Sequence, residues 1–390
     1  MPCLSDSSQN GIPDENIVVM MYDDIANNQV NPTPGIIINK PNGKDVYHGV
    51  LKDYTKEEVT PENFLNILKG DKQAMSGIGS GKVIDSGPND HVFVFFTDHG
   101  APGLIAFPNS ELMASDLIEA INDMNKNKKF SRMVFYIEAC ESGSMFQNKL
   151  DKNINVYATT ASNPHESSYA CYYDKKRQTY LGDVYSVKWM ENSDAVDLSK
   201  ESLQQQYTIV KKETNTSHVM QYGDLDFKNE DLEDYQGEGN GKGSGISPQE
   251  YHGEPITDAV PVPDVHLKIL QNRLREAPFS DRQAIIHEIE ELYKMKEEIR
   301  KTMETIVEQC VSSDEQMIRV LKSSADPQDF NCYKQAVKAF SRNCYNLGKN
   351  EHALRHVYAL SNLCEENIPA KLIVSAINEQ CGEDEPGVQF

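Results

Sequence analysis

Four short apolar runs, each bounded by polar turn residues, lie in the first 160 residues of the chain. They cover residues 17–22, 92–96, 133–137 and 154–158. Runs of this length without strict polar alternation are typical of strands buried on both faces. Between the second and third runs, apolar residues recur at helical spacing over 110–128. The alternation of strand and helix predicts an α/β fold with a mostly parallel sheet flanked by helices.

A further helix is predicted ahead of the second run. Thr60 can cap its start, and Pro61 follows at the first helical position, where a proline is tolerated because its missing N–H would be unpaired anyway. Gly70 then ends the helix.

The composition changes between residues 224 and 263, where acidic residues greatly outnumber basic ones. Glycines alternate with polar residues in this segment, at Gly237, Gly239, Gly241, Gly243 and Gly245. Such a segment is flexible and self-repelling, so we interpret it as a linker.

Beyond the linker, apolar residues follow one face of a long predicted helix. They are Ile285, Ile286, Ile289, Leu292, Ile299, Met303 and Ile306. Several shorter helical patterns follow, so an all-α domain is expected. The predicted organisation is an atypical N-terminal segment at 1–10, an α/β domain at 11–223, the acidic linker at 224–263 and a helical domain at 264–390.

The charge balance narrows the range of partners. The chain has 38 Lys and Arg against 60 Asp and Glu, a formal net charge of -22. This surplus of negative charge argues against nucleic acid or an anionic membrane surface as partner. No apolar stretch is long enough to predict a membrane span. The opening residues, MPCLSDSSQN, lack the features of a secretory signal, so the chain as written is expected in the cytosol.

Four of the eight cysteines fall in the last sixty residues, at Cys332, Cys344, Cys364 and Cys381. An even set in a small helical region, without a CxxC pair, favours two disulfides over a zinc site. Four reduced cysteines in the core are an equally good interpretation of the spacing alone. We expect no metal and no cofactor.

Two of the predicted strands end in reactive residues. The run 92–96 leads into His99 and Gly100, and the run 133–137 leads into Glu138 and Cys140. Ligands of open α/β sheets bind beyond the carboxyl ends of the strands. If the two strands are neighbours, the imidazole can deprotonate the thiol and return a proton to a leaving amine. The backbone N–H groups of Gly100 and Cys140 are the candidate oxyanion donors.

Each residue also has a simpler interpretation. A lone Cys after an apolar strand is more often a small buried hydrophobe, and a lone His is often a satisfied polar residue. Their joint occurrence at two strand ends favours a cysteine peptidase.

Several longer segments carry a specific resemblance. They are TDHG at 97–100, YIEACESGSMF at 136–146, INVYATTASNP at 154–164, ESSYACYYD at 166–174 and YLGDVYSVKWMENSD at 180–194. Together they resemble the legumain family of asparaginyl endopeptidases, in the caspase-like clan. The resemblance extends from residue 11 to 222 and resumes at the C-terminal cysteines. Caspases proper are disfavoured because their QAC-type motif is absent.

The resemblance implies an activity and a site. It implies hydrolysis after asparagine, less often after aspartate, with peptide ligation as an additional reaction. His99 and Cys140 match the catalytic dyad. For Asp98 the family suggests either a role in orienting the histidine or succinimide formation, and an ordinary acid at a strand end is the simpler interpretation. The pocket residues implied are Glu138 and Asp183, with Ser167, Ser168 and Tyr169 on the wall. A carboxamide offers two N–H donors, which suits the two carboxylates.

The resemblance also implies how activity is controlled. The helical domain would cap the cleft as a latency module, released in acid after cleavage in the linker. It implies disulfides between Cys332 and Cys364 and between Cys344 and Cys381. Asn215 lies in a sequon where the family carries one, so glycosylation is expected on export. Protein and peptide substrates, cystatin-type inhibitors, a monomeric state and a lysosomal, vacuolar or secreted location complete what the family implies.

The chain departs from the family before Gly11, where the family has a first strand and a following helix. The family's histidine-orienting asparagine and pocket arginine fall in that segment. We therefore expect this form to fold poorly, or to have much reduced activity and asparagine selectivity. Two alternatives remain: a glycolipid-anchor transamidase subunit, which shares a similar dyad, and a catalytically silent binding protein that retains the fold.

Overall fold

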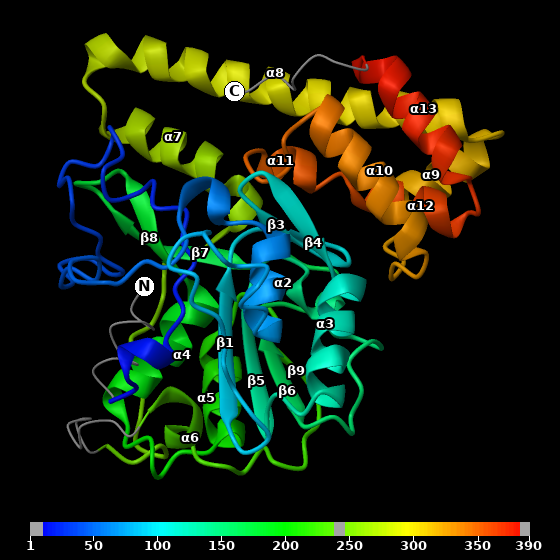
Figure 1. Cartoon of the computed structure of the whole chain (residues 1–390). Helices are drawn as coiled ribbons and strands as arrows, with labels where there is room; N and C mark the ends of the chain where they lie inside the picture. The colour runs from blue at the N-terminus through cyan, green and yellow to red at the C-terminus, as the bar shows by residue number, and fades with distance from the viewer. Residues whose placement is uncertain (1–10, 238–245, 383–390) are drawn as a thin grey trace.

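The computed structural model describes residues 11–237 and 246–382 (Figure 1). Its central sheet has the strand order β1 (His91–Thr97), β5 (Arg132–Glu138), β6 (Val156–Thr160) and β9 (Met220–Gly223). The first three strands are parallel and β9 is antiparallel. The α/β fold with a mostly parallel sheet is therefore confirmed, together with the strands predicted at 92–96 and 133–137. The third strand, predicted at 154–158, begins and ends two residues later.

Alternate residues of β5 pack into two different cores. Met133, Phe135 and Ile137 face one core, which includes residues of α2 (Pro61–Lys69) and α3 (Ala114–Lys126). Val134 and Tyr136 face the other core, which helices on the opposite side of the sheet complete. Those helices are α4 (Val184–Ala195), α5 (Leu203–Glu213) and α6 (Glu233–Gln236). Burial on both faces explains why this strand has no polar alternation.

Helix α2 begins and ends as the sequence predicts. The hydroxyl of Thr60 accepts a hydrogen bond from the backbone N–H of Asn63 at 3.2 Å, and Pro61 is the first helical residue. Gly70 takes the left-handed conformation with φ 73°, which a residue without Cβ adopts at least cost.

The strand predicted at 17–22 is wrong. This run has a single isolated bridge, between Met20 and Tyr54. The carbonyl of Val19 accepts the N–H groups of Asp53 and Tyr54, and the Asp53 carboxylate accepts the N–H of Val19 at 2.9 Å. The apolar pattern correctly indicates burial of Val19, but its backbone groups pair with a loop and a side chain instead of a strand.

The helix predicted over 110–128 is partly wrong. Its first four residues form β4 (Ser110–Met113), which pairs with β3 (Leu104–Phe107), and β3 pairs with β2 (Gly100–Ala101). The helix α3 begins only at Ala114. Apolar side chains at Leu112 and Met113 fit either structure, and the partner strand decides between them.

A second small sheet has the order β10 (Val260–Pro261), β7 (Tyr169–Asp174) and β8 (Thr179–Asp183). Its first strand comes from the segment interpreted as a flexible linker. Other described parts of that segment also pack on the α/β core, with Leu232, Tyr235 and Tyr251 buried there. Four of its glycines, Gly239, Gly241, Gly243 and Gly245, lie outside the described residues. Apolar residues spaced among the acids hold the described parts in place.

The C-terminal part is helical, as predicted. Its helices are α7 (Val265–Glu276), α8 (Phe279–Cys310), α9 (Asp314–Lys322), α10 (Phe330–Asn343), α11 (Glu351–Leu354), α12 (Tyr358–Glu365) and α13 (Ala370–Cys381). The long helix α8 runs across the end of the molecule above the small sheets (Figure 1). Of the predicted apolar face, Ile285, Leu292, Ile299, Met303 and Ile306 are buried. Within the described residues, none of the helices is long and apolar enough to cross a bilayer.

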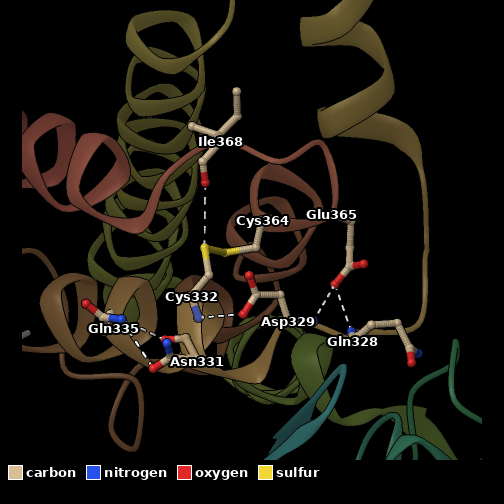
Figure 2. The surroundings of a disulfide bond; sticks show 8 residues. All are labelled: Gln328, Asp329, Asn331, Cys332, Gln335, Cys364, Glu365 and Ile368. Atoms are coloured by element: carbon tan, nitrogen blue, oxygen red, sulfur yellow. Dashed lines mark hydrogen bonds between the residues drawn. A yellow bond between two sulfur atoms is a disulfide. The ribbon is translucent and has the colours of Figure 1, made fainter.

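Two disulfides join these helices, so the alternative of four reduced cysteines is excluded. Cys332 is bonded to Cys364, and Cys344 to Cys381. Figure 2 shows the first of these beside the start of α10, where the Asp329 carboxylate accepts the N–H of Cys332 at 2.9 Å. The Glu365 carboxylate accepts the N–H groups of Gln328 and Asp329, so a second carboxylate holds the segment at the start of α10.

Removal of the first disulfide should destabilise the helical part. The bond closes a separation of 32 residues, and for such a loop the chain-entropy argument gives about 4 kcal/mol. We expect the Cys332→Ala/Cys364→Ala variant to unfold at lower denaturant concentration, with the loss confined to the helical part, as hydrogen exchange would show. If the wild-type protein under reducing conditions is more stable than this variant, the loss comes from packing rather than from the cross-link.

Candidate active site

The parallel register brings the ends of β1 and β5 together. Thr97 lies opposite Glu138, and the N–H of Asp98 donates to the carbonyl of Glu138 at 3.2 Å. A Cβ built on Gly100 would lie 2.3 Å from the carbonyl oxygen of Cys140. His99 and Cys140 therefore follow neighbouring strands at the same edge of the sheet, and only glycine fits at position 100.

The thiol of Cys140 is shielded and neutral in this structure. Its residue is 4% exposed, and its sulfur lies 3.6 Å from the hydroxyl of Ser168. Burial, with a smaller contribution from the charge of Glu141, raises the pKa of the Cys140 thiol to about 12. Because the thiolate is the reactive form of cysteine, this thiol is unreactive while it is buried in this way.

The imidazole of His99 is partly covered by the helical part of the chain, and 32% of its side chain remains exposed. Its Nε2 lies 3.9 Å from a carboxylate oxygen of Glu351, at the start of α11. Burial lowers the pKa of His99, and the charge of Glu351 only partly opposes this effect. The Asp98 carboxylate accepts the backbone N–H of His99 at 2.6 Å. This contact holds the backbone of His99 rather than its imidazole ring.

Two carboxyl groups lie beneath this edge. The Glu138 Oε2 atom accepts both the N–H and the hydroxyl of Ser186, each at 2.9 Å. Among the described residues, Glu138 Oε1 is buried with no hydrogen-bond partner. Burial and then the charge of Asp183 raise the pKa of Glu138 well above its ordinary value, and burial raises that of Asp183 to about 6. The pair thus holds a buried, open acceptor atom.

The residues predicted to form the pocket wall lie between these carboxyls and the thiol. Ser168 is buried, and its hydroxyl lies near enough to Glu138 to offset part of the rise in that residue's pKa. Ser167 precedes it, and Tyr169 begins β7, whose Ala170 pairs with Asp183 on β8. The structure therefore brings Cys140 and Glu138 together around Ser168.

Helices of the C-terminal part close this edge. Ala101, Leu104, Ala106 and Met113, from the hairpins after His99, share one apolar cluster with residues of α8, α10 and α12. The hydroxyl of Ser341 donates to Glu111 at 2.6 Å, and Lys334 pairs with Asp116 at 2.7 Å. The family resemblance implied that the helical domain caps the cleft, but it did not identify Glu351 or the other contact residues, since nothing in local spacing pairs residues so far apart.

One further predicted feature, the sequon, can be placed. Asn215 is exposed, in the loop between α5 and β9, as an acceptor of a glycan must be. Within residues 11–237 and 246–382, no three His, Cys, Asp or Glu side chains gather as a metal-binding set.

Comparison with known proteins identifies the family. Residues 6–238 match the model of the peptidase C13 family, and residues 287–381 match that of the legumain prodomain. The chain belongs to the peptidase C13 family. As a member of this family it is a cysteine endopeptidase that carries a C-terminal prodomain.

Full-length relatives agree with this assignment. Legumain from Bos taurus is 50% identical over 376 residues, which cover 96% of this chain and 86% of that protein. Legumain from Rattus norvegicus is 51% identical over 378 residues with the same coverage. The delta isozyme of vacuolar-processing enzyme from Arabidopsis thaliana is 40% identical over 397 residues, covering 96% of this chain and 84% of that protein. These C13 relatives support asparaginyl cysteine endopeptidase activity.

Among solved structures, the crystal structure of caspase-1 from Spodoptera frugiperda is similar at a TM-score of 0.29 and 13% identity. The match covers 46% of this chain and 71% of that one.

Proposed function

We propose that Cys140 is the nucleophile and His99 the general base of this C13 peptidase. The observation that carries the proposal is the register of β1 and β5, which puts Gly100 against Cys140 at one edge of the sheet. The transamidase and silent-binder alternatives are not favoured by the relatives.

In the proposed reaction, His99 takes the thiol proton and the thiolate attacks the carbonyl carbon of the scissile bond. The N–H groups of Gly100 and Cys140 donate to the oxyanion. His99 then gives its proton to the leaving amine, which departs and leaves an acyl thioester. Water, deprotonated by His99, hydrolyses the thioester, whereas a peptide amine in place of water would give ligation.

The pocket of Glu138 and Asp183 is proposed to bind the asparagine side chain. The open Oε1 atom of Glu138 offers an acceptor for a carboxamide N–H, and Asp183 supplies a second carboxylate. Ser167, Ser168 and Tyr169 form the wall. Aspartate is accepted in acid, when its own carboxyl and the pocket pair carry more protons.

The helical region 264–390 is proposed to be a latency domain on the catalytic region 11–223, and segment 224–263 carries the activation cleavage. Burial under the helices lowers the pKa of His99, so capping is stable above the ordinary pKa of histidine and weakens as pH falls through it. Burial raises the pKa of Glu111 to about 7 and that of Glu141 to about 8. Protonation of these two carboxyls therefore stabilises the capped form as pH falls, which opposes the effect of His99. Acid release therefore requires the protonation of His99 to outweigh the protonation of these two carboxyls.

We infer a lysosomal or vacuolar site of action from the names of the plant relatives and from the family. Two extracellular-type disulfides and the exposed sequon at Asn215 support passage through an oxidising compartment. Protein and peptide substrates follow from the activity, and a monomer inhibited by cystatin-type proteins is our proposal for its partners.

An active-site probe with an asparagine-like recognition group tests this function. We expect no labelling of the intact chain at neutral pH, because Cys140 is buried and its pKa is raised to about 12. After acid treatment that detaches the helical part, Cys140 should be labelled and the Cys140→Ser variant should not. Labelling of the intact capped protein would contradict latency, and no labelling after detachment would favour a silent binding protein.

A further inference from the structure

The loop between β6 and β7, residues 161–168, forms neither helix nor strand, yet it carries the candidate pocket wall. Its last residue, Ser168, places a hydroxyl 3.6 Å from the sulfur of Cys140. A loop without a hydrogen-bonded ladder needs other contacts to hold such a position. The geometry between wall and nucleophile therefore depends on what anchors this loop.

The near end of the loop is fixed by Ser162. Its hydroxyl donates to the carbonyl of Ala139 at 3.1 Å and accepts from the N–H of Ser142 at 3.2 Å. The carbonyl of Ser162 accepts the N–H of Gly143 at 3.1 Å. These bonds join the start of the loop to the turn that holds Cys140, but they do not reach its second half.

The second half is anchored at its end by the backbone, where the carbonyl of Ser168 accepts the N–H of Val262 at 3.0 Å, and ahead of Ser168 through Glu166. Its Oε1 atom accepts the backbone N–H groups of Asn163 at 2.9 Å and of His218 at 2.7 Å. Its Oε2 atom lies 2.8 Å from Nδ1 of His218. An exposed ion pair alone contributes little, but a carboxylate that accepts two backbone N–H groups forms the stronger, charge-assisted kind of bond.

Glu166 is also joined to the nucleophile turn through its backbone. Its carbonyl accepts the N–H of Glu141 at 2.8 Å, and Glu141 directly follows Cys140 in a left-handed conformation with φ 50°. One residue thus connects three segments: the turn after β5, the wall loop, and the segment before β9. Burial tends to raise the pKa of Glu166, but the bonds from Asn163 and His218 hold it below its ordinary value, so the carboxylate stays ionised in mild acid.

We propose that Glu166, supported by His218, is a positioning residue that holds Ser168 and the pocket wall in place relative to Cys140. It touches neither the substrate nor the thiol, and it acts through the backbone of the wall loop. The proposal rests on the proposed function, because it assumes that Cys140 is the nucleophile and that residues 167–169 line the substrate pocket.

The test compares Glu166→Ala with Glu166→Gln after identical acid activation. In the alanine variant the N–H groups of Asn163 and His218 lose their carboxylate acceptor. We expect kcat/KM for an asparagine reporter to fall about 100-fold, chiefly in kcat, since misplacement near the reacting bond has effects of this size. Gln keeps one oxygen for the N–H groups of Asn163 and His218, so its kcat/KM should stay within about fivefold of wild type. The matched control is Asp85→Ala, which removes an exposed carboxylate that pairs with Lys72 elsewhere in the region 11–223. It should leave kcat/KM unchanged.

A second readout separates positioning from general destabilisation. Alkylation of Cys140 by iodoacetamide needs the thiol but not the pocket wall, so its rate in Glu166→Ala should change by less than about threefold. A parallel fall in alkylation and hydrolysis, or failure of Gln to rescue, would show a purely structural role and overturn the proposal. Wild-type rates in Glu166→Ala would overturn it as well. If wild type itself fails to cleave the reporter, it is the proposed function that fails.

Discussion

Replacing Cys140 with Ser should reduce hydrolysis of an Ala-Ala-Asn reporter by about 10⁴-fold or more after acid activation. A serine hydroxyl has no thiolate form at working pH, and the base beside it is matched to a thiol. His99→Ala should have an effect of similar size, because the thiol then has no proton acceptor. The double variant should be hardly worse than either single one, since residues that act as a unit are not additive.

The matched control for Cys140 is Cys310→Ala. Cys310 is also a buried free thiol, but it lies at the end of α8 in the helical part. Its replacement should leave the activated rate unchanged. If Cys140→Ser keeps more than about one hundredth of the wild-type rate, or if Cys310→Ala is equally damaged, the nucleophile has been assigned to the wrong residue.

The common location of the candidate residues His99 and Cys140 at one sheet edge could be predicted from sequence, because it depends on local pattern. Short apolar runs predict buried strands, and a parallel sheet presents strand ends at a common edge. His99 and Cys140 follow such runs directly. From sequence, the pairing of β1 with β5 is an assumption. The register in the structure shows that the two strands are neighbours.

The incorrect expectations have one physical cause. Periodicity reports which side chains avoid water, but it does not report the partner of each backbone group. Residues 17–22 are partly buried yet pair with a loop, and residues 110–113 pair as a strand although their spacing also fits a helix. Segment 224–263 is acidic overall, but Tyr235 and Tyr251 hold parts of it on the core.

The supporting residues of the site could not be found from sequence for the same reason. His218 and Glu166 are 52 positions apart, and Glu351, which lies near His99, comes from the C-terminal helical part. No helix or strand period links such positions, and acids and histidines of this kind are ordinarily surface residues. The pocket carboxylates Glu138 and Asp183 were assigned only through the family resemblance.

Replacing Glu138 with Gln should change which residue the enzyme cuts after. Ser186 donates two hydrogen bonds to one oxygen of Glu138, so the amide oxygen of Gln will take that place and its NH₂ group will replace the open acceptor. A donor then faces the NH₂ group of asparagine, and we expect kcat/KM for asparagine to fall by about 10²- to 10³-fold, because buried donors are left unpaired. The same donor suits a carboxylate, so cleavage after aspartate should fall much less.

The pH dependence of the ratio between asparagine and aspartate cleavage gives an independent check. In wild type the pocket pair has raised pKa values, so as pH falls through about 6 it gains protons and loses negative charge that repels aspartate. Aspartate cleavage should therefore rise relative to asparagine cleavage in acid, and Glu138→Gln, which removes one of the two charges, should flatten this change. Glu201→Gln alters another buried carboxyl, whose pKa burial raises to about 7, away from the pocket, and should keep the wild-type ratio at every pH. An unchanged ratio in Glu138→Gln would mean that asparagine is recognised elsewhere.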